Sequence, residues 1–263
     1  MHERPRDRDV SGRLRLSSPA ARVLNRRWLM IALAAAAPIT MTACSSSSGS
    51  DVGASTPTSQ TVSHPAGGGR AHLKRVVLRR TDFPSGWTSK PASSGDDTDS
   101  RGDQRRMATC VGIRNTAADQ VAAVKSPVFA NGPVQLSSSV YRYKRHSDIK
   151  TDTALFTSPK ADGCFRRIFR SDLGGLLPSG ARAERVSVHV TRRTRHEPRN
   201  VIATITVSVL VAVSGRHVEV RMTETAIAGR LIEADVIGIG IGRPVPALQQ
   251  RLAATVAHRA ARL

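Results

Sequence analysis

The sequence predicts an α+β domain, an antiparallel sheet of about five strands with helices packed on it, including a C-terminal helix. Apolar residues occupy every second position over 201–213, which is the period of a strand with one buried face. The turn residues Ser214-Gly215 and Gly229 lead into two further strand-like runs, so three long strands form an antiparallel meander. An apolar stripe at helical spacing follows over 245–256. Strands and helices that are segregated along the chain indicate the α+β class.

The N-terminus has the organisation of an export signal. Residues 1–27 contain eight arginines, and the apolar run that follows them, Trp28 to about Ala37, is shorter than the ~20 residues that span a bilayer. A basic region, a short apolar run and small residues after it are typical of a secretory signal. The letters RRWLM at 26–30 also have the twin-arginine shape, so general secretion and twin-arginine export both stay open.

A cysteine ends this signal. The order Met41-Thr42-Ala43-Cys44 resembles a bacterial lipobox, in which the cysteine is lipidated and becomes the first mature residue. The resemblance implies a lipoprotein signal peptide at 1–43, a palmitate-type anchor on Cys44, and a location on the outer face of the cell membrane. Several acyl chains on one cysteine give durable anchoring. The alternative is a soluble secreted protein that is cleaved near Ala43.

A change in composition marks the start of the folded part. Residues 44–70 are rich in Ser, Thr, Gly and Pro and have no aromatic residue, so they cannot bury enough apolar surface to offset their chain entropy. We therefore expect a disordered tether here, with a folded N-terminal extension as the alternative. The remaining residues, 71–263, are enough for a single domain with its own core.

The net charge of the chain limits the chemical classes of partner that it is expected to bind. The sequence has 40 Lys and Arg against 20 Asp and Glu, and without residues 1–43 it keeps 32 against 17. The mature net charge is therefore about +15. Export removes the usual nucleic-acid partners, and no basic helix or aromatic platform is evident, so we expect no nucleic acid. Anionic lipid or an acidic wall polymer is the better partner, and a merely solvated basic surface is the alternative.

Two cysteines remain once Cys44 is set aside. Cys110 and Cys164 form an even pair, which outside the cytoplasm predicts a disulfide. The alternatives are free thiols or a metal site. The eight histidines are scattered without ligand spacing, so we predict no metal and no cofactor.

The start of the domain combines a short helix with a turn. Residues 72–80 have helical spacing of apolar side chains, and Pro84 and Gly86 then favour a turn that places Trp87. Two roles are open for Trp87. It lines a ligand pocket, or it seals the edge of the core.

The middle of the domain is expected to alternate between helix and strand. The expected elements are a mobile loop at 91–106, a helix at 107–125, a strand at 134–144 and a helix at 147–157. Within the strand, Tyr141 and Tyr143 fall opposite the aliphatic residues, which indicates a bulge. Ser158-Pro159 then resembles a helix start, and Cys164 lies in the helix that follows. Two helices would thus carry the two cysteines.

Glu224 is the first candidate for a ligand contact. It follows Val220 and Met222 on the apolar face of a predicted strand. A carboxylate among apolar side chains needs a partner, so Glu224 is a candidate binding residue in a cleft between sheet and helices. The alternatives are a change of register or an edge position at which Glu224 meets water.

The turn before residue 201 is the second candidate. Arg192, Arg193 and Arg195 make it strongly basic, and it is the best local candidate for contacting anions, with a solvated turn as the alternative. Catalytic patterns do not support an enzyme. The one S-x-x-K match, at 147–150, lacks the S-D-N and K-T-G elements of penicillin-recognising enzymes, so we predict no catalytic residue.

Three alternating glycines, Gly238, Gly240 and Gly242, close the last strand. They do not match a nucleotide-binding loop, because no G-x-G-x-x-G spacing is present. Alternating glycines remove side chains along one face of a strand, which lets another element approach closely. The C-terminal helix is the obvious candidate.

These features together resemble a known group of exported proteins. The opening DFPSGW, the strand near SSSVYRYK, the Cys164 helix, the meander and the closing PALQQRLAATVAHRA are similar to actinobacterial exported lipoproteins of the sensor-domain-like type. The layout over most of 71–263 resembles the extracytoplasmic sensor domains of mycobacterial serine/threonine kinases. The resemblance implies a non-catalytic, membrane-anchored binding or sensor-like domain. The alternatives are a cell-envelope hydrolase or an envelope scaffold without a small ligand.

Overall fold

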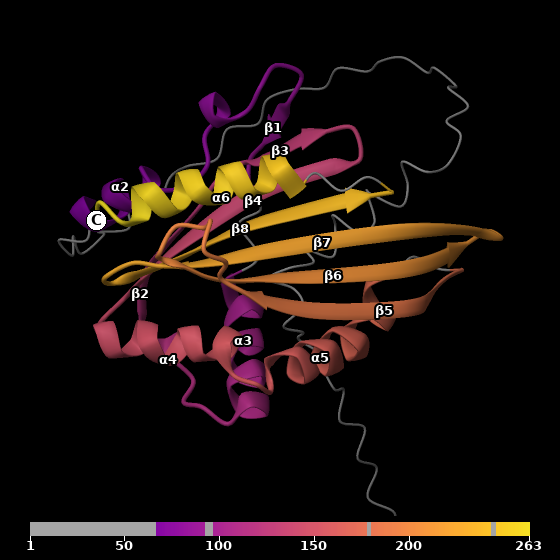
Figure 1. Ribbon diagram of the computed structural model, residues 1–263, viewed down its shortest axis with the longest axis horizontal. Helices are drawn as coiled ribbons and strands as arrows, with labels where there is room; N and C mark the ends of the chain where they lie inside the picture. Colours follow the sequence, from indigo (N-terminus) through magenta and orange to yellow (C-terminus); the bar gives the residue numbers. More distant parts are fainter. Residues whose placement is uncertain (1–66, 93–96, 178–179, 243–245) are drawn as a thin grey trace, which may run out of the picture.

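The computed structural model describes residues 67–92, 97–177, 180–242 and 246–263, and it confirms the α+β class (Figure 1). The described strands form one antiparallel sheet of eight strands, so the expected number of about five was wrong. The predicted signal peptide, Cys44 and the predicted tether up to residue 66 lie outside the described residues. Helix α2 begins at Gly67, inside the C-terminal end of that predicted tether.

The elements have the following bounds. The helices are α2 (Gly67–Lys74), α3 (Asp97–Val111), α4 (His146–Thr157), α5 (Ala161–Leu176) and α6 (Pro246–Ala260), with short 3-10 turns η2 (Arg80–Asp82) and η3 (Ala117–Asp119). The strands are β1 (Thr88–Lys90), β2 (Gln120–Lys125), β3 (Val128–Asn131), β4 (Val134–Tyr143), β5 (Ala181–Arg192), β6 (Val201–Val213), β7 (Arg216–Ala228) and β8 (Ile232–Ile241).

The sheet is built around the predicted meander. Its order is β1-β3-β4-β8-β7-β6-β5, and β2 also pairs with β4. Strands β5 to β8 are consecutive neighbours joined by turns, and β4 closes on the far side of β8. The long strand β5 therefore forms one edge of the sheet.

Helices cover both faces of the sheet and create two cores. Helices α3, α4 and α5 pack on one face, where strand residues such as Val207, Val209 and Met222 meet Phe169 and Leu173 of α5. Helices α2 and α6 pack on the opposite face, as Figure 1 shows. Fully burying an aliphatic or aromatic side chain contributes about 1.5–3 kcal/mol, so the two layers together hold the helices on the sheet.

The predicted helix at 107–125 was wrong beyond its first residues. Helix α3 already runs through the expected mobile loop and ends at Val111. Gly112 follows with φ +85°, a left-handed conformation that ends a helix and that glycine adopts without strain. Residues 120–125 instead form β2, because their backbone pairs with β4.

The irregularity expected around Tyr141 and Tyr143 lies in the partner strand and not in β4. The register of β4 with β8 is continuous from Val134 to Arg142, whereas its pairing with β2 shifts between Gln120 and Ala122, opposite Tyr143 and Arg142. Tyr141 and Tyr143 are both buried, 4% and 1% exposed, although they point away from the face of Val140. The reason is that helices cover both faces of β4, so its pattern is not that of a half-exposed strand.

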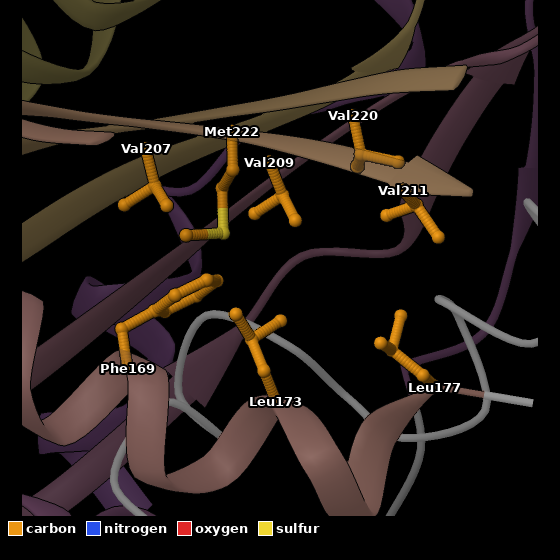
Figure 2. Close-up of a pocket in the computed structure, with 8 residues that line it drawn as sticks. All are labelled: Phe169, Leu173, Leu177, Val207, Val209, Val211, Val220 and Met222. Atoms are coloured by element: carbon orange, nitrogen blue, oxygen red, sulfur yellow. The ribbon is translucent and has the colours of Figure 1, made fainter. Parts of the chain in front are cut away.

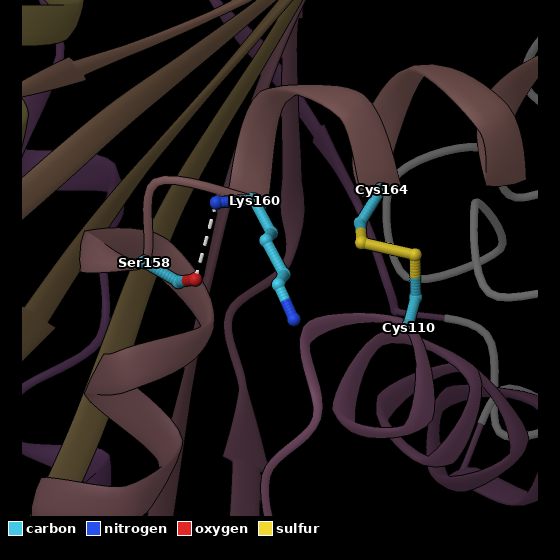
Figure 3. The surroundings of a disulfide bond; sticks show 4 residues. All are labelled: Cys110, Ser158, Lys160 and Cys164. Atoms are coloured by element: carbon cyan, nitrogen blue, oxygen red, sulfur yellow. Dashed lines mark hydrogen bonds between the residues drawn. A yellow bond between two sulfur atoms is a disulfide. The ribbon is translucent and has the colours of Figure 1, made fainter.

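Ser158 ends helix α4 and does not, as was predicted, begin helix α5. Its N–H donates to the Ala154 carbonyl and thereby ends α4, while α5 begins at Ala161. The Ser158 hydroxyl accepts a hydrogen bond of 3.2 Å from the Lys160 N–H, which orders the short link between the two helices (Figure 3). The predicted helix carrying Cys164 is otherwise confirmed.

Candidate functional site

The two cysteines of the domain form the predicted disulfide. Cys110 near the end of α3 and Cys164 in the first turns of α5 are bonded, with their Cα atoms 5.8 Å apart (Figure 3). Both helices pack on the same face of the sheet. The disulfide therefore ties two neighbouring helices of one layer together.

Trp87 belongs to the core. It is 6% exposed, and its ring lies 5.0 Å from that of Phe83, which in turn stacks on Phe129 at 4.2 Å. Gly86 has φ +82°, the left-handed conformation that the predicted turn requires. The aromatic cluster closes the edge of the core beside α2 and α6, and a ligand role for Trp87 stays a prediction.

The three arginines predicted to contact anions have different surroundings. Arg192 donates to the Thr157 carbonyl at the end of α4 with an N···O distance of 3.0 Å. Arg193 and Arg195 are exposed in the link between β5 and β6. Glu197 accepts the Thr194 N–H at 2.6 Å and shapes this turn.

Glu224 lies in the interior of the sheet. It is 6% exposed, and its neighbours on the adjacent strands are Ile205 and Ile237. It does not meet water at an edge, and the register of β7 with β8 is unbroken around it. Glu224 has a protein partner, so its burial does not by itself indicate a ligand.

A network of polar side chains fills the space between the sheet and helices α3 and α4. The Tyr143 hydroxyl lies 2.8 Å from Asp152 Oδ2 and 2.9 Å from Glu233 Oε2. Gln104 donates to Thr116 at 2.8 Å and also bonds Asp152. All five residues are at most 3% exposed.

The Tyr143 hydroxyl lies within hydrogen-bond distance of two carboxyl groups but cannot donate to both. It has one hydrogen, so it donates to only one of the two carboxyl groups at a time. Its oxygen accepts a hydrogen bond of 2.9 Å from Gln120 Nε2, which brings in strand β2. The network thus connects the sheet with α3 and α4 through hydrogen bonds among side chains.

The interface between α5 and the inner strands β6 and β7 is also closed, whereas an open groove lies at its rim, between α5 and β5. A cavity of about 10 Å³, roughly the size needed for one water molecule, lies among aliphatic and aromatic side chains that converge from both sides (Figure 2). Phe169, Leu173 and Leu177 approach from the helix side, and Val209 and Met222 from the sheet. An apolar gap of this size is a packing defect and does not hold a ligand.

An open groove lies on the other face of the sheet, over β5, β6 and the start of β7. Its volume is about 530 Å³. In β6 the odd-numbered residues are buried and the even-numbered ones half-buried, so this part of the face is not covered as β8 is. The polar side chains that line it are Arg185, Ser187, His189, Thr206, Ser208, Arg221 and one carboxylate, Glu219, which pairs with Arg221. We call these seven residues the arginine groove.

The strand register brings the groove residues together. Ser187, Ser208 and Arg221 stand in one row across β5, β6 and β7. His189 and Thr206 form the next row, and Arg185 lies two residues before Ser187 on the same face. Neighbours within a row lie about 4.8 Å apart and successive rows on one face about 7 Å apart, so side chains of adjacent rows reach a common ligand.

The arginine groove was missed, although the sequence contained a signal for it. Arg185, Ser187 and His189 alternate with buried valines, which places them on one face of β5. The prediction of an anion contact at Arg192, Arg193 and Arg195 concentrated on charge that is dense along the chain. The groove instead collects residues that are dispersed over three strands.

The described residues offer no assembled metal or membrane element. Among them, no group of three His, Cys, Asp or Glu side chains is arranged to hold a metal ion. None of the described helices has the length and apolar character needed to cross a bilayer.

Comparison with known proteins finds likeness to solved structures but no match at the level of sequence families. No family model matches the sequence, and no curated protein matches it. The solved structure of the extracellular domain of PknH from Mycobacterium tuberculosis is similar over 73% of this chain and 96% of that chain, with 10% sequence identity and a TM-score of 0.40.

Proposed function

We propose that this protein is an exported lipoprotein, anchored through Cys44 to the outer face of the cell membrane, whose domain is a non-catalytic binding module for an anionic envelope component. The observation that carries the proposal is the disulfide between Cys110 and Cys164. Disulfides persist in oxidising compartments and are rare where thiols are kept reduced. The bonded pair also accounts for both cysteines of the domain and leaves only Cys44, directly after the signal-like run.

The arginine groove supports binding over catalysis. A hydrolase needs a nucleophile with a base in hydrogen-bond reach. Within the described chain, His189 makes no hydrogen bond to Ser187, Thr206 or Ser208. An open groove with arginines and hydroxyl groups has the donors that hold an anion, and it has no activated nucleophile.

The anchor is tested by substituting the cysteine that would carry it. We expect Cys44→Ser to move the protein from the membrane fraction to the soluble exported fraction, because the acyl chains supply the membrane affinity. Membrane and soluble fractions of expressing cells are compared by immunoblotting, and protease treatment of intact cells reports the side of the membrane.

The matched control removes the other two cysteines. Cys110→Ser with Cys164→Ser should leave attachment unchanged, because neither residue lies near the signal. Full membrane retention of Cys44→Ser would contradict the anchor. Protection of the wild-type protein from protease in intact cells would contradict export.

A further inference from the structure

The arginine groove lies in the most one-sidedly basic part of the domain. Residues 181–221 contain eight arginines, three glutamates, and neither lysine nor aspartate. The glutamates are already engaged. Glu184 pairs with Arg182 at 3.2 Å and with His217 at 3.0 Å. The positive charge on this half of the sheet therefore exceeds what its own carboxylates neutralise.

The two groove arginines have donors to spare. In the described part of the chain, no carboxylate oxygen lies within 4.0 Å of the Arg185 guanidinium. Arg221 pairs with Glu219 at 3.1 Å through one Nη2, and its Nε is buried without any acceptor. A buried donor without a partner is unfavourable. A ligand oxygen that accepts a hydrogen bond from the Arg221 Nε would remove that cost.

The chemistry of these donors favours phosphate. A guanidinium presents parallel N–H groups that fit two oxygens of one phosphate, which a lysine ammonium cannot do. The hydroxyl groups of Ser187 and Ser208 stand in the same row as Arg221 and next to the row of Arg185, and Thr206 lies in the row beyond them, so all three add donors at the floor of the groove. Among the described residues, these three hydroxyls have no hydrogen-bond partner of their own.

The shape of the site favours a polymer over a lipid surface. The groove is hollow, and a flat layer of head groups does not enter a hollow. Among the described residues, the only exposed large apolar side chains are Val121 and Leu263, and neither lines the groove. The groove is also open to solvent and spans three strands, so several phosphate groups of one chain can enter it.

We propose that the arginine groove binds the phosphate groups of an extended anionic polymer of the cell envelope, with Arg185 and Arg221 as the principal contacts. This inference rests on the proposed function, because export is what brings such a polymer within reach. It moves the binding site from the predicted Arg192, Arg193 and Arg195 to the open face of β5–β7.

The test compares two variants that remove equal charge. Binding of linear inorganic polyphosphate to the purified full chain in detergent is measured by calorimetry. We expect Arg185→Gln with Arg221→Gln to weaken binding about tenfold, which corresponds to about 1.4 kcal/mol. The control, Arg193→Gln with Arg195→Gln, also lowers the net charge by two and should stay within about twofold of the wild type. Arg185→Gln alone, at an exposed position, should weaken binding in the same direction.

Other probes separate the alternatives. Polyglutamate should bind less tightly than polyphosphate, and phosphatidylglycerol vesicles should not compete for the groove. Equal losses in the two double variants, preference for the vesicles, or no binding of polyphosphate by the wild type would each overturn the inference. Because the protein is in detergent, these results do not depend on whether Cys44→Ser releases it from membranes.

Discussion

Arg259, near the end of α6, contacts the start of the domain through the Asp82 carboxylate and the Val77 carbonyl. Its guanidinium lies 2.6 Å and 2.9 Å from the two Asp82 oxygens, and it also donates to the Val77 carbonyl at 3.1 Å. Asp82 accepts the Arg79 N–H as well, at 2.8 Å. Burial raises the pKa of Asp82, but the hydrogen bonds and charges of Arg259 and Arg79 outweigh it and bring the pKa below its ordinary value of 3.8.

The pair makes a pH-dependent prediction. We expect Arg259→Gln to lower the free energy of unfolding at pH 7 by about 2 kcal/mol, a typical contribution of hydrogen bonds to a charged group. A carboxyl whose folded-state pKa is lowered stabilises the fold above its unfolded pKa and loses that effect as the pH falls through the folded pKa. The difference between variant and wild type should therefore shrink below about pH 4. Urea unfolding across acidic pH measures it.

An arginine on the same helix provides the control. Arg251 is exposed, and Arg251→Gln should change the free energy of unfolding by less than about 0.5 kcal/mol at every pH. A deficit of Arg259→Gln that stays constant from pH 7 to acid would show that Arg259 acts by packing and not through the charge of Asp82.

Among the elements, α6 packs closely against the sheet at a glycine. A Cβ at Gly238 would overlap with the Gln249 side chain and lie 3.0 Å from Leu136 Cδ2. Gln249 is 6% exposed and donates to the Thr223 carbonyl at 3.0 Å, so it cannot simply swing into solvent. The predicted close approach of the C-terminal helix to the glycine face is confirmed at Gly238.

Crowding at this contact is testable by a double-mutant cycle. We expect Gly238→Ala to lower the free energy of unfolding by about 1–3 kcal/mol, because overpacking forces neighbouring side chains from their rotamers. Gln249→Ala removes the obstructing side chain. The two changes together should therefore cost less than the sum of their separate effects, as thermal or urea unfolding of the four proteins would reveal. Strict additivity would place the effect of Gly238→Ala elsewhere, for example in the backbone of β8.

The elements that the sequence predicted well are those that bury only one face, because their apolar residues then recur with a clear period. Strand β6 shows its buried face at every second residue, and α6 shows its stripe, so both could be placed without knowing the rest. Strands β1, β2 and β3 have only three to six residues each and were missed. Their state is decided by pairing with distant residues, as for the Ala- and Val-rich β2 against β4, and local propensity does not report that pairing.

The candidate site was hidden for a related reason. The alternation in β5 placed Arg185 on a polar face, but the sequence does not reveal which strands α6 leaves uncovered. Glu224 looked exceptional as a carboxylate on an apolar face. The fold shows instead that it stands between Ile205 and Ile237 in the interior of the sheet, and that Tyr143, Asp152 and Glu233, which come from separate elements, form a polar network elsewhere in the sheet–helix interface.

At the scale of the whole molecule, the disulfide links the fold to the compartment. Cys110 and Cys164 are separated by 54 residues. In the chain-entropy model, closing a loop of that length raises the free energy of the unfolded chain, and so stabilises the fold, by about 4 kcal/mol. The loop contains α4, so the constraint spans the whole helical layer on one face of the sheet. A domain folded before oxidation would lack that contribution.

This gives the last prediction. Cys110→Ala with Cys164→Ala should lower the melting temperature of the domain by roughly 10 °C, as expected for about 4 kcal/mol in a chain of this size. Circular dichroism is measured with and without a reducing agent. The reducing agent should bring the wild type to the level of the variant, and Cys44→Ser should melt like the wild type. If the reducing agent does not lower the melting temperature of the wild type, the disulfide adds no stability beyond that of the core. If the destabilisation is found, full stability would be reached only in an oxidising compartment, which is where the proposed polymer would be met.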